Sequence, residues 1–225
     1  MKINKYIEHT LLKPEATIAE IEQLANEAIE HDFLGICINP THIKHAKKLL
    51  MDSEVKIVTV IGFPLGANDS SVKAFETKKA IEDGADEVDM VINIGALKDK
   101  KHELIENDIK AVVLAANGTP VKVIIETDLL NIDEIKKASE LTANAKAQFV
   151  KTSTGFVKNG VGAKVDDVKL MYATVKDFGL QIKASGGVRD KNTALALIDA
   201  GATRLGTSSG VKLVSDEDFI SSGGY

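Results

Sequence analysis

The chain has 225 residues, of which 44% are hydrophobic and 27% are charged, and its formal net charge at pH 7 is −5. This acidic balance argues against a general nucleic-acid or membrane-surface binder, because such proteins usually present a basic face. The single cysteine, Cys37, excludes an internal disulfide framework, and neither a membrane-spanning apolar run nor a signal peptide is recognisable. We therefore expect one cytoplasmic domain over residues 1–225, with no nucleic-acid or membrane partner.

Short runs of β-branched residues alternate along the chain with longer segments of helical periodicity. The first run is short and partly polar, whereas several later runs are continuously apolar, as expected for strands that helices cover. This alternation is typical of βα units on a parallel sheet. The expected strands are residues 6–11, 34–39, 55–61, 87–92, 121–126, 148–151, 181–184 and 203–206.

The segments between these strands carry the start and stop signals of helices. Thr17 and Glu20 form a capping box at the start of the first one. Pro40 suits the first turn of the helix that follows the second strand. Glycines occur where helices should end before the next strand, at Gly84, Gly118, Gly179 and Gly201.

Eight strands in roughly 200 residues favour a single closed (β/α)8 barrel, the TIM-barrel fold, which belongs to the α/β class. An open doubly wound sheet remains an alternative, because closure is not visible in a sequence. The barrel would carry a short N-terminal extension. The polar segment 215–225 ends in Ser-Ser-Gly-Gly-Tyr and is expected to be a flexible C-terminal tail.

Two lysines close neighbouring strands at the end where a barrel places its active site. Lys151 ends the run QFV and Lys183 ends LQI. Adjacent strands lie about 4.8 Å apart, so the two ammonium groups could approach to about 5 Å. Their repulsion, about 3 kcal/mol at an effective dielectric near 20, would favour the free amine that a Schiff-base lysine needs. The structural alternative is two lysines that pair with carboxylates or extend to solvent.

Asp89 lies within the apolar strand EVDMVIN. Strand alternation puts Asp89, Val91 and Asn93 on one face and the residues between them on the other. A buried carboxylate needs a partner, so an inward Asp89 could pair with Lys151 or Lys183 and act as an acid/base group. A salt bridge that only holds the barrel together is the competing interpretation.

Two glycine-containing turns follow the last two strands, where barrels commonly bind phosphate. Glycines allow the backbone to approach a ligand, and N–H groups at the start of a helix favour an anion. The competing interpretation is two ordinary tight turns. The candidate phosphate-binding residues are Ser185, Gly186, Gly187, Gly206, Ser208 and Ser209.

No metal site is predicted. His42 and His45 share a helix face, but no third ligand is apparent near them. Cys37 is interpreted first as a small buried apolar residue and second as a residue of the site.

Five stretches together resemble the deoxyribose-phosphate aldolase family, and the similarity runs from about residue 5 to the C-terminus. The order and spacing of the two lysine-led motifs are the most specific part. The matching stretches are 7–14 (IEHTLLKP), 59–66 (TVIGFPLG), 86–93 (DEVDMVIN), 151–156 (KTSTGF) and 183–189 (KASGGVR).

The resemblance implies a cofactor-free barrel aldolase that reversibly cleaves 2-deoxyribose 5-phosphate to acetaldehyde and glyceraldehyde 3-phosphate. It implies that Lys151 is the Schiff-base lysine, Lys183 the lysine that perturbs it, and Asp89 a proton relay. Tyr225 would be the C-terminal tyrosine that helps to move a proton. A homodimer is also implied. The remaining candidate substrate-binding residues are Glu8, Cys37 and Thr154, beside the two turns given above.

The sequence departs from the family pattern at two places. Glu8 stands where the family usually has Asp, and residues 161–164 (VGAK) stand where Gly-Gly-Ala-Thr is usual. Three other functions stay open: a Schiff-base aldolase for another small phosphorylated sugar, a phosphate-site isomerase or lyase without a covalent step, and an inactive metabolite-binding barrel.

Overall fold

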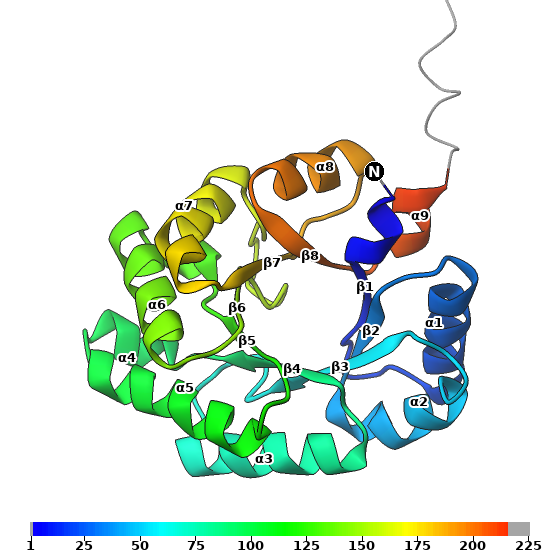
Figure 1. The fold of residues 1–225 in the computed structure, drawn as a ribbon, viewed down its shortest axis with the longest axis horizontal. Helices are drawn as coiled ribbons and strands as arrows, with labels where there is room; N and C mark the ends of the chain where they lie inside the picture. The colour runs from blue at the N-terminus through cyan, green and yellow to red at the C-terminus, as the bar shows by residue number, and fades with distance from the viewer. Residues whose placement is uncertain (1, 216–225) are drawn as a thin grey trace, which may run out of the picture.

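The computed structural model describes residues 2–215, and within them eight parallel strands close into a barrel (Figure 1). Each strand pairs with its neighbours in sequence, and β8 pairs with β1. The predicted (β/α)8 barrel is therefore confirmed, and the open sheet is wrong. The strands are β1 (Ile7–Leu11), β2 (Gly35–Ile38), β3 (Lys56–Ile61), β4 (Glu87–Val91), β5 (Val121–Ile124), β6 (Phe149–Lys151), β7 (Gln181–Ser185) and β8 (Ala202–Thr207).

Helices surround this barrel on its outside (Figure 1). Short 3-10 turns occur beside several of them: η1 (Ile3–Tyr6), η2 (Pro40–His42), η3 (Thr127–Leu129) and η4 (Lys176–Phe178). The α-helices are α1 (Ile18–Glu30), α2 (Ile43–Leu49), α3 (Ser70–Asp83), α4 (Ile94–Lys98), α5 (His102–Ala116), α6 (Ile132–Asn144), α7 (Val165–Val175), α8 (Lys191–Asp199) and α9 (Gly210–Val214).

The predicted strands agree with the observed ones within about two residues at each end, the usual disagreement at element boundaries. The N-terminal extension is η1, which contacts α9 and β8. Pro40 begins η2 instead of an α-helix, and α2 starts only at Ile43.

Helix ends follow the predicted local chemistry. The Thr17 side chain accepts a hydrogen bond from the Glu20 backbone, and Glu20 reciprocates, which completes the capping box. Gly84 ends α3 with φ +114°, a conformation that residues with a side chain rarely adopt.

The two faces of the sheet have different partners. Val88, Met90 and Ile92 of the β4 segment belong to the main hydrophobic core between barrel and helices. Asp89 points the other way, into the barrel, as strand alternation predicts. The interior holds a small apolar cluster that includes Cys37, Val58 and Val60. Charged side chains fill much of the rest of the interior.

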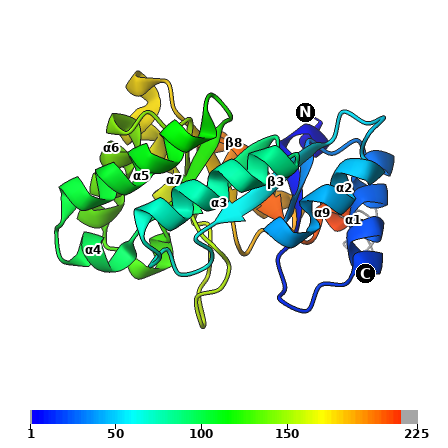
Figure 2. The same ribbon diagram turned by 90° about the horizontal axis from the view of Figure 1, so that it is seen from below.

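The connections after the strands gather at one end of the barrel. In Figure 2 the segment after β1 and the yellow-green segment after β6 project from the same end. Both line the cleft described below. Among residues 2–215, no helix has the length and apolar character to cross a membrane.

A buried ion pair joins α3 to α5 outside the barrel. Lys73 is fully buried, and its Nζ donates to Asp108 Oδ2 at 2.6 Å and to the Val91 carbonyl at 2.9 Å. Ser70 donates to the other Asp108 oxygen at 2.8 Å. All the polar atoms of this pair have partners, and the pair links two helices to the end of β4.

We expect Asp108→Asn to lower the free energy of unfolding by about 3 kcal/mol, because Lys73 would keep a buried charge without its counter-ion. Urea-induced unfolding followed by circular dichroism measures this loss. Glu106→Gln on the same helix is the control, since Glu106 pairs with Lys110 at the surface and should change stability by about 0.5 kcal/mol or less. Equal losses in the two variants would contradict the assignment.

Candidate active site

A cleft of about 350 Å³ opens at the carboxyl end of the barrel. Its walls come from the ends of β1, β6, β7 and β8 and from the turns that follow them. Lys151 is the lysine of the barrel interior that lines it. The other lining residues include Thr154, Ser185, Gly186, Gly187, Gly206 and Ser208 of the predicted set.

Asp89 lies at the centre of a buried charge cluster beneath this cleft. Its Oδ2 accepts from Lys151 Nζ at 2.7 Å and from Lys183 Nζ at 2.6 Å. Its Oδ1 accepts from Lys122 Nζ at 3.0 Å. The predicted proximity of Lys151 and Lys183 is thus confirmed, and Asp89 pairs with both of them.

Strand register brings these side chains together. Lys151 and Lys183 are direct partners across β6 and β7, and Asp89 and Lys122 are direct partners across β4 and β5. Because partners in a ladder point to the same face, each pair turns inward together. The repulsion expected from the sequence is therefore offset by a carboxylate oxygen that both ammonium groups contact.

Lys122 is the member of the cluster that sequence reasoning missed. It is fully buried on β5 between Val121 and Val123, and it also pairs with Glu87 at 2.7 Å. The signal in the sequence was a lysine flanked by β-branched residues in the middle of a strand. Such a lysine must face either the helices or the barrel interior, and in both places it needs a carboxylate.

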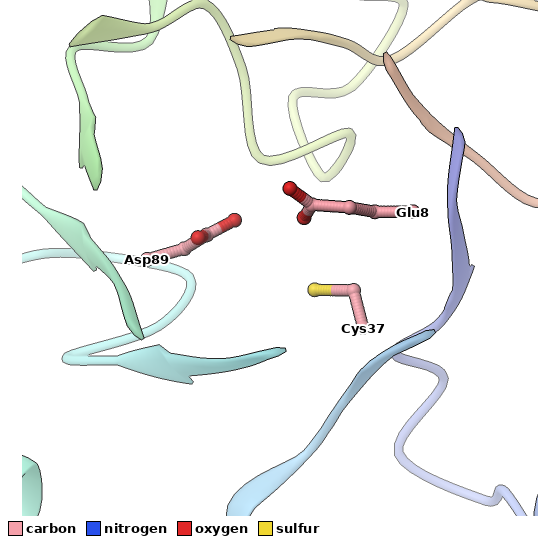
Figure 3. A group of neighbouring side chains, drawn as sticks. All are labelled: Glu8, Cys37 and Asp89. Carbon is pink, nitrogen blue, oxygen red and sulfur yellow. The ribbon is translucent and has the colours of Figure 1, made fainter. Parts of the chain in front are cut away.

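Figure 3 shows Glu8, Cys37 and Asp89 pointing toward one another across the interior from β1, β2 and β4. One ligand atom of each lies within 4.8 Å of the others, a spacing that a metal ion could use. Lys183 Nζ contacts the carboxylates of both Glu8 and Asp89, however. The ammonium group therefore already supplies the positive charge that these two carboxylates require.

The pKa directions follow from this arrangement. Burial alone would raise the pKa of Asp89, but Lys122, Lys151 and Lys183 outweigh it and hold the pKa of this carboxyl well below its usual range. Burial alone would lower the pKa of Lys183 and of Lys122, but the nearby carboxylates outweigh it and raise both pKa values. The carboxylates therefore favour the ammonium form of Lys183 and Lys122.

Glu8 and Cys37 lie below the cleft, outside the residues described as lining it. Glu8 reaches Lys183 in spite of its extra methylene relative to Asp, and its other oxygen lies 3.5 Å from Lys122 Nζ. Burial raises the pKa of the Cys37 thiol. Cys37 is accordingly a neutral, buried thiol, in agreement with the first of its two interpretations.

Thr154 is fixed by Glu126, a residue to which the sequence analysis gave no role. Its backbone N–H and its hydroxyl both donate to the Glu126 carboxylate, and its hydroxyl accepts from the Phe156 backbone at 3.0 Å. Glu126 adopts φ +62°, and burial raises its pKa. These contacts hold the turn after β6 in place along the cleft.

The turns after β6 and β7 lie against each other, and at Gly162 and Gly187 there is no room for a side chain. A Cβ on Gly162 would approach the Gly186 carbonyl carbon to 2.3 Å, and a Cβ on Gly187 would approach the Val161 carbonyl oxygen to 2.2 Å. Ala163 also donates a backbone hydrogen bond to Gly186. Glycine is needed here because the two backbones interlock.

Thr207 joins the turns after β7 and β8. Its hydroxyl donates to the Val188 carbonyl at 2.6 Å and accepts from the Ser209 backbone at 2.9 Å. Ser208 lines the cleft, whereas Ser209 precedes α9 and is not among the lining residues. The two predicted phosphate turns are therefore neighbours.

Asp128 contacts residues 161–164, the loop at which the sequence departs from the family pattern. Lys164 precedes α7 and gives it no side-chain cap. Asp128 instead accepts from the Gly162 backbone at 2.7 Å and pairs with Lys164 Nζ at 3.1 Å. Tyr225, the remaining predicted catalytic residue, lies outside the described residues.

The low pKa of Asp89 makes its contribution to stability pH-dependent. A carboxyl group with a lowered folded-state pKa stabilises the protein above its unfolded-state pKa, here about 3.8, and loses that contribution as the pH falls. The free energy of unfolding of the unsubstituted chain should therefore exceed that of Asp89→Asn at about pH 6, and the gap should shrink toward about pH 3. A gap that stays constant over urea titrations in this range would contradict the assignment.

Comparison with known proteins agrees with this geometry. Residues 4–215 match the model of the DeoC/LacD family aldolases. Deoxyribose-phosphate aldolase 1 of Staphylococcus aureus is 56% identical over 97% of this chain and 100% of its own length. The deoxyribose-phosphate aldolase of Bdellovibrio bacteriovorus is 55% identical over the full length of both. The tetrameric deoxyribose phosphate aldolase structure from Aeropyrum pernix has a TM-score of 0.86 and 32% identity, covering 94% of this chain and 88% of that one. The chain belongs to the DeoC/LacD aldolase family.

Proposed function

We propose that this chain reversibly cleaves 2-deoxy-D-ribose 5-phosphate to acetaldehyde and D-glyceraldehyde 3-phosphate through a Schiff base on Lys151. The observation that carries the proposal is the position of Lys151. Of the three lysines that contact Asp89, it is the one that lines the cleft, while Lys122 and Lys183 are fully buried. The names of the relatives support the choice of substrate.

The charges of the cluster support the covalent step. Lys122 is held by Asp89 and Glu87 and Lys183 by Asp89 and Glu8, whereas among the described residues Lys151 pairs with Asp89 only. Lys151 is therefore the lysine with the fewest carboxylate partners, and it is the one that a substrate in the cleft can reach. Its free amine attacks the C1 aldehyde of the open-chain sugar, and water leaves to form a cationic iminium. Asp89, 2.7 Å from Lys151 Nζ, then stabilises that positive charge.

Cleavage follows from the iminium. The C3 hydroxyl loses its proton, the C2–C3 bond breaks, and its electron pair forms an enamine on Lys151 while glyceraldehyde 3-phosphate leaves. We assign Asp89 to the proton transfer, through water. Because its lowered pKa makes it a weak base, it passes the proton on and does not retain it. The enamine is then protonated at C2 and hydrolysed to acetaldehyde, and we assign this protonation to Tyr225.

The phosphate end of the substrate is proposed to lie at the turns after β7 and β8. Gly186, Gly187, Gly206 and Ser208 line this side of the cleft, and backbone N–H groups there would bind the anion. Binding at this end orients the reacting carbons toward Lys151. The family likeness further leads us to propose a homodimer as the active form.

We expect the covalent adduct on Lys151. Incubation with acetaldehyde and borohydride should add one ethyl group that peptide mass spectrometry places on Lys151, and Lys151→Met should abolish it. Lys79→Met, which removes a surface lysine, is the control and should still be trapped. An adduct on Lys183, or none, would refute the assignment, and absence of trapping would favour an isomerase or lyase without a covalent step.

We expect Gly187→Ala to raise KM for deoxyribose 5-phosphate at least about tenfold while unphosphorylated deoxyribose is much less affected. The added Cβ would collide with the Val161 carbonyl and displace the proposed phosphate turn. Gly179→Ala is the matched control, because Gly179 has a similar φ of +77° but open space around its Cβ position. Equal losses for both substrates would point to a folding defect instead.

A further inference from the structure

Glu126 follows β5 and adopts φ +62°, in the left-handed region that residues with a side chain rarely occupy. Among the described residues, six other than glycine have a positive φ, and Glu126 alone of these is buried, with 2% exposure. The exposed five are Asp32, Lys100, Asn117, Lys146 and Asn159. Backbone strain of this kind persists where surrounding contacts hold it, and it gathers at functional sites.

The backbone around Glu126 has one residue more than its pairing with the neighbouring chain requires. The Ile125 N–H donates to the Lys151 carbonyl, and the Thr127 N–H donates to the Thr152 carbonyl. In a regular parallel ladder, two donors that are two residues apart would meet carbonyls that are also two residues apart. Glu126 is thus the extra residue of a bulge, and a bulge redirects the side chain of that residue.

The Glu126 carboxylate is buried against Thr154 and not against a cation. The Thr154 N–H lies 3.1 and 3.3 Å from its two oxygens, and the Thr154 hydroxyl donates to Oε2. Lys151, the cation whose charge acts on it, pairs with Asp89 instead. Burial raises the pKa of Glu126, and the hydrogen bonds from Thr154 oppose that rise. A strained backbone and a buried carboxylate therefore serve the contact with one residue.

Thr154 is not held by the sheet, because the pairing of β6 with both neighbouring strands ends at Lys151. Within the described part of the chain, every hydrogen bond between residues 154–159 and the rest of the molecule goes to Glu126. Phe156 donates its N–H to the Thr154 hydroxyl at 3.0 Å, so it is held through the same contact. Thr154 and Phe156 both line the cleft, and their position there depends on Glu126.

We propose that Glu126 is a positioning residue that fixes, through Thr154, the wall of the cleft that aligns the five-carbon sugar with Lys151. This inference rests on the proposed aldol cleavage. Glu126 does not line the cleft and touches no reacting atom. If the wall recedes, Lys151 stays in its strand, so the two-carbon acetaldehyde should still form a Schiff base while the longer sugar is misaligned. The phosphate turns follow other strands, so phosphorylated and unphosphorylated deoxyribose should be affected equally.

Two substitutions separate the contact from the charge. Glu126→Gly removes the carboxylate and keeps the backbone conformation, since glycine adopts a positive φ without strain. A side cavity of about 80 Å³ borders Glu126, so water can then reach the Thr154 N–H. Glu126→Gln keeps both contacts, because its amide oxygen can accept from the N–H and its amide nitrogen can donate to the hydroxyl. Lys146→Gly is the matched control, since Lys146 has φ +65° but is exposed between α6 and β6 and does not line the cleft.

Trapping with acetaldehyde and borohydride, followed by intact mass spectrometry, counts the molecules in which Lys151 is competent. The values of kcat/KM for deoxyribose 5-phosphate and for deoxyribose are then expressed per trapped molecule. We expect Glu126→Gly to lower both values by the same factor, about tenfold or more, with an unchanged trapped fraction. Its unfolding temperature should stay within about 2 °C of that of the unsubstituted enzyme, since the buried charge and the strain are removed together with the contact. Glu126→Gln should keep both kcat/KM values within about threefold, and Lys146→Gly should not change them.

The outcomes distinguish this inference from the function on which it rests. If acetaldehyde does not trap the unsubstituted enzyme, the proposed Schiff-base function itself is wrong. If it does, and Glu126→Gly retains both kcat/KM values, Glu126 has no positioning role. A loss that follows the trapped fraction or the unfolding temperature would show that Glu126 only supports the fold. Equal losses in Glu126→Gln and Glu126→Gly would show that the charge matters and the contact with Thr154 does not, which also refutes the positioning role.

Discussion

Charged side chains from β1, β4, β5, β6 and β7 meet inside the barrel, and they are stable there only as a group. Asp89 contacts three lysines, and Lys183 bridges Asp89 to Glu8. Removing any one member leaves a charge in a water-excluded interior, which is far more unfavourable than losing a surface pair. Closure of the barrel and assembly of the site are therefore one event, because these partners are brought together only when all the strands are in register.

The contacts within this charge cluster also explain why Lys151 differs from Lys122 and Lys183, although all three are lysines. Lys122 and Lys183 are enclosed by carboxylates and hold their protons, whereas Lys151 ends its short strand at the floor of the cleft. Access to the cleft separates the reactive position from the structural ones. The departure at Glu8 is tolerated for a related reason, since a longer carboxylate still reaches Lys183.

The proximity of Lys151 and Lys183 and the inward direction of Asp89 could be predicted from the sequence. Both follow from the alternation of side chains along a strand and from the order of the strands along the chain. Lys122 was missed because one lysine in an apolar strand gives no indication of which face it occupies until the register with β4 is known. The sequence also could not show that Lys151 and Lys183 contact the same oxygen of Asp89, because this contact depends on how far the side chains extend across several strands. Glu8 and Cys37, two candidate substrate-binding residues, are buried and do not line the cleft, and for Cys37 this agrees with its first interpretation as a buried apolar residue.

The interlocked glycines of the turns after β6 and β7 have a consequence for how such a site can diverge. Gly162 and Gly186 leave no gap between their backbones, and Val161 closes on Gly187 in the same way. Neither turn can gain a side chain at Gly162 or Gly187 unless the other turn shifts. The sequences of the two turns should therefore covary during evolution. A change of specificity at this end of the cleft would require simultaneous substitutions in both turns.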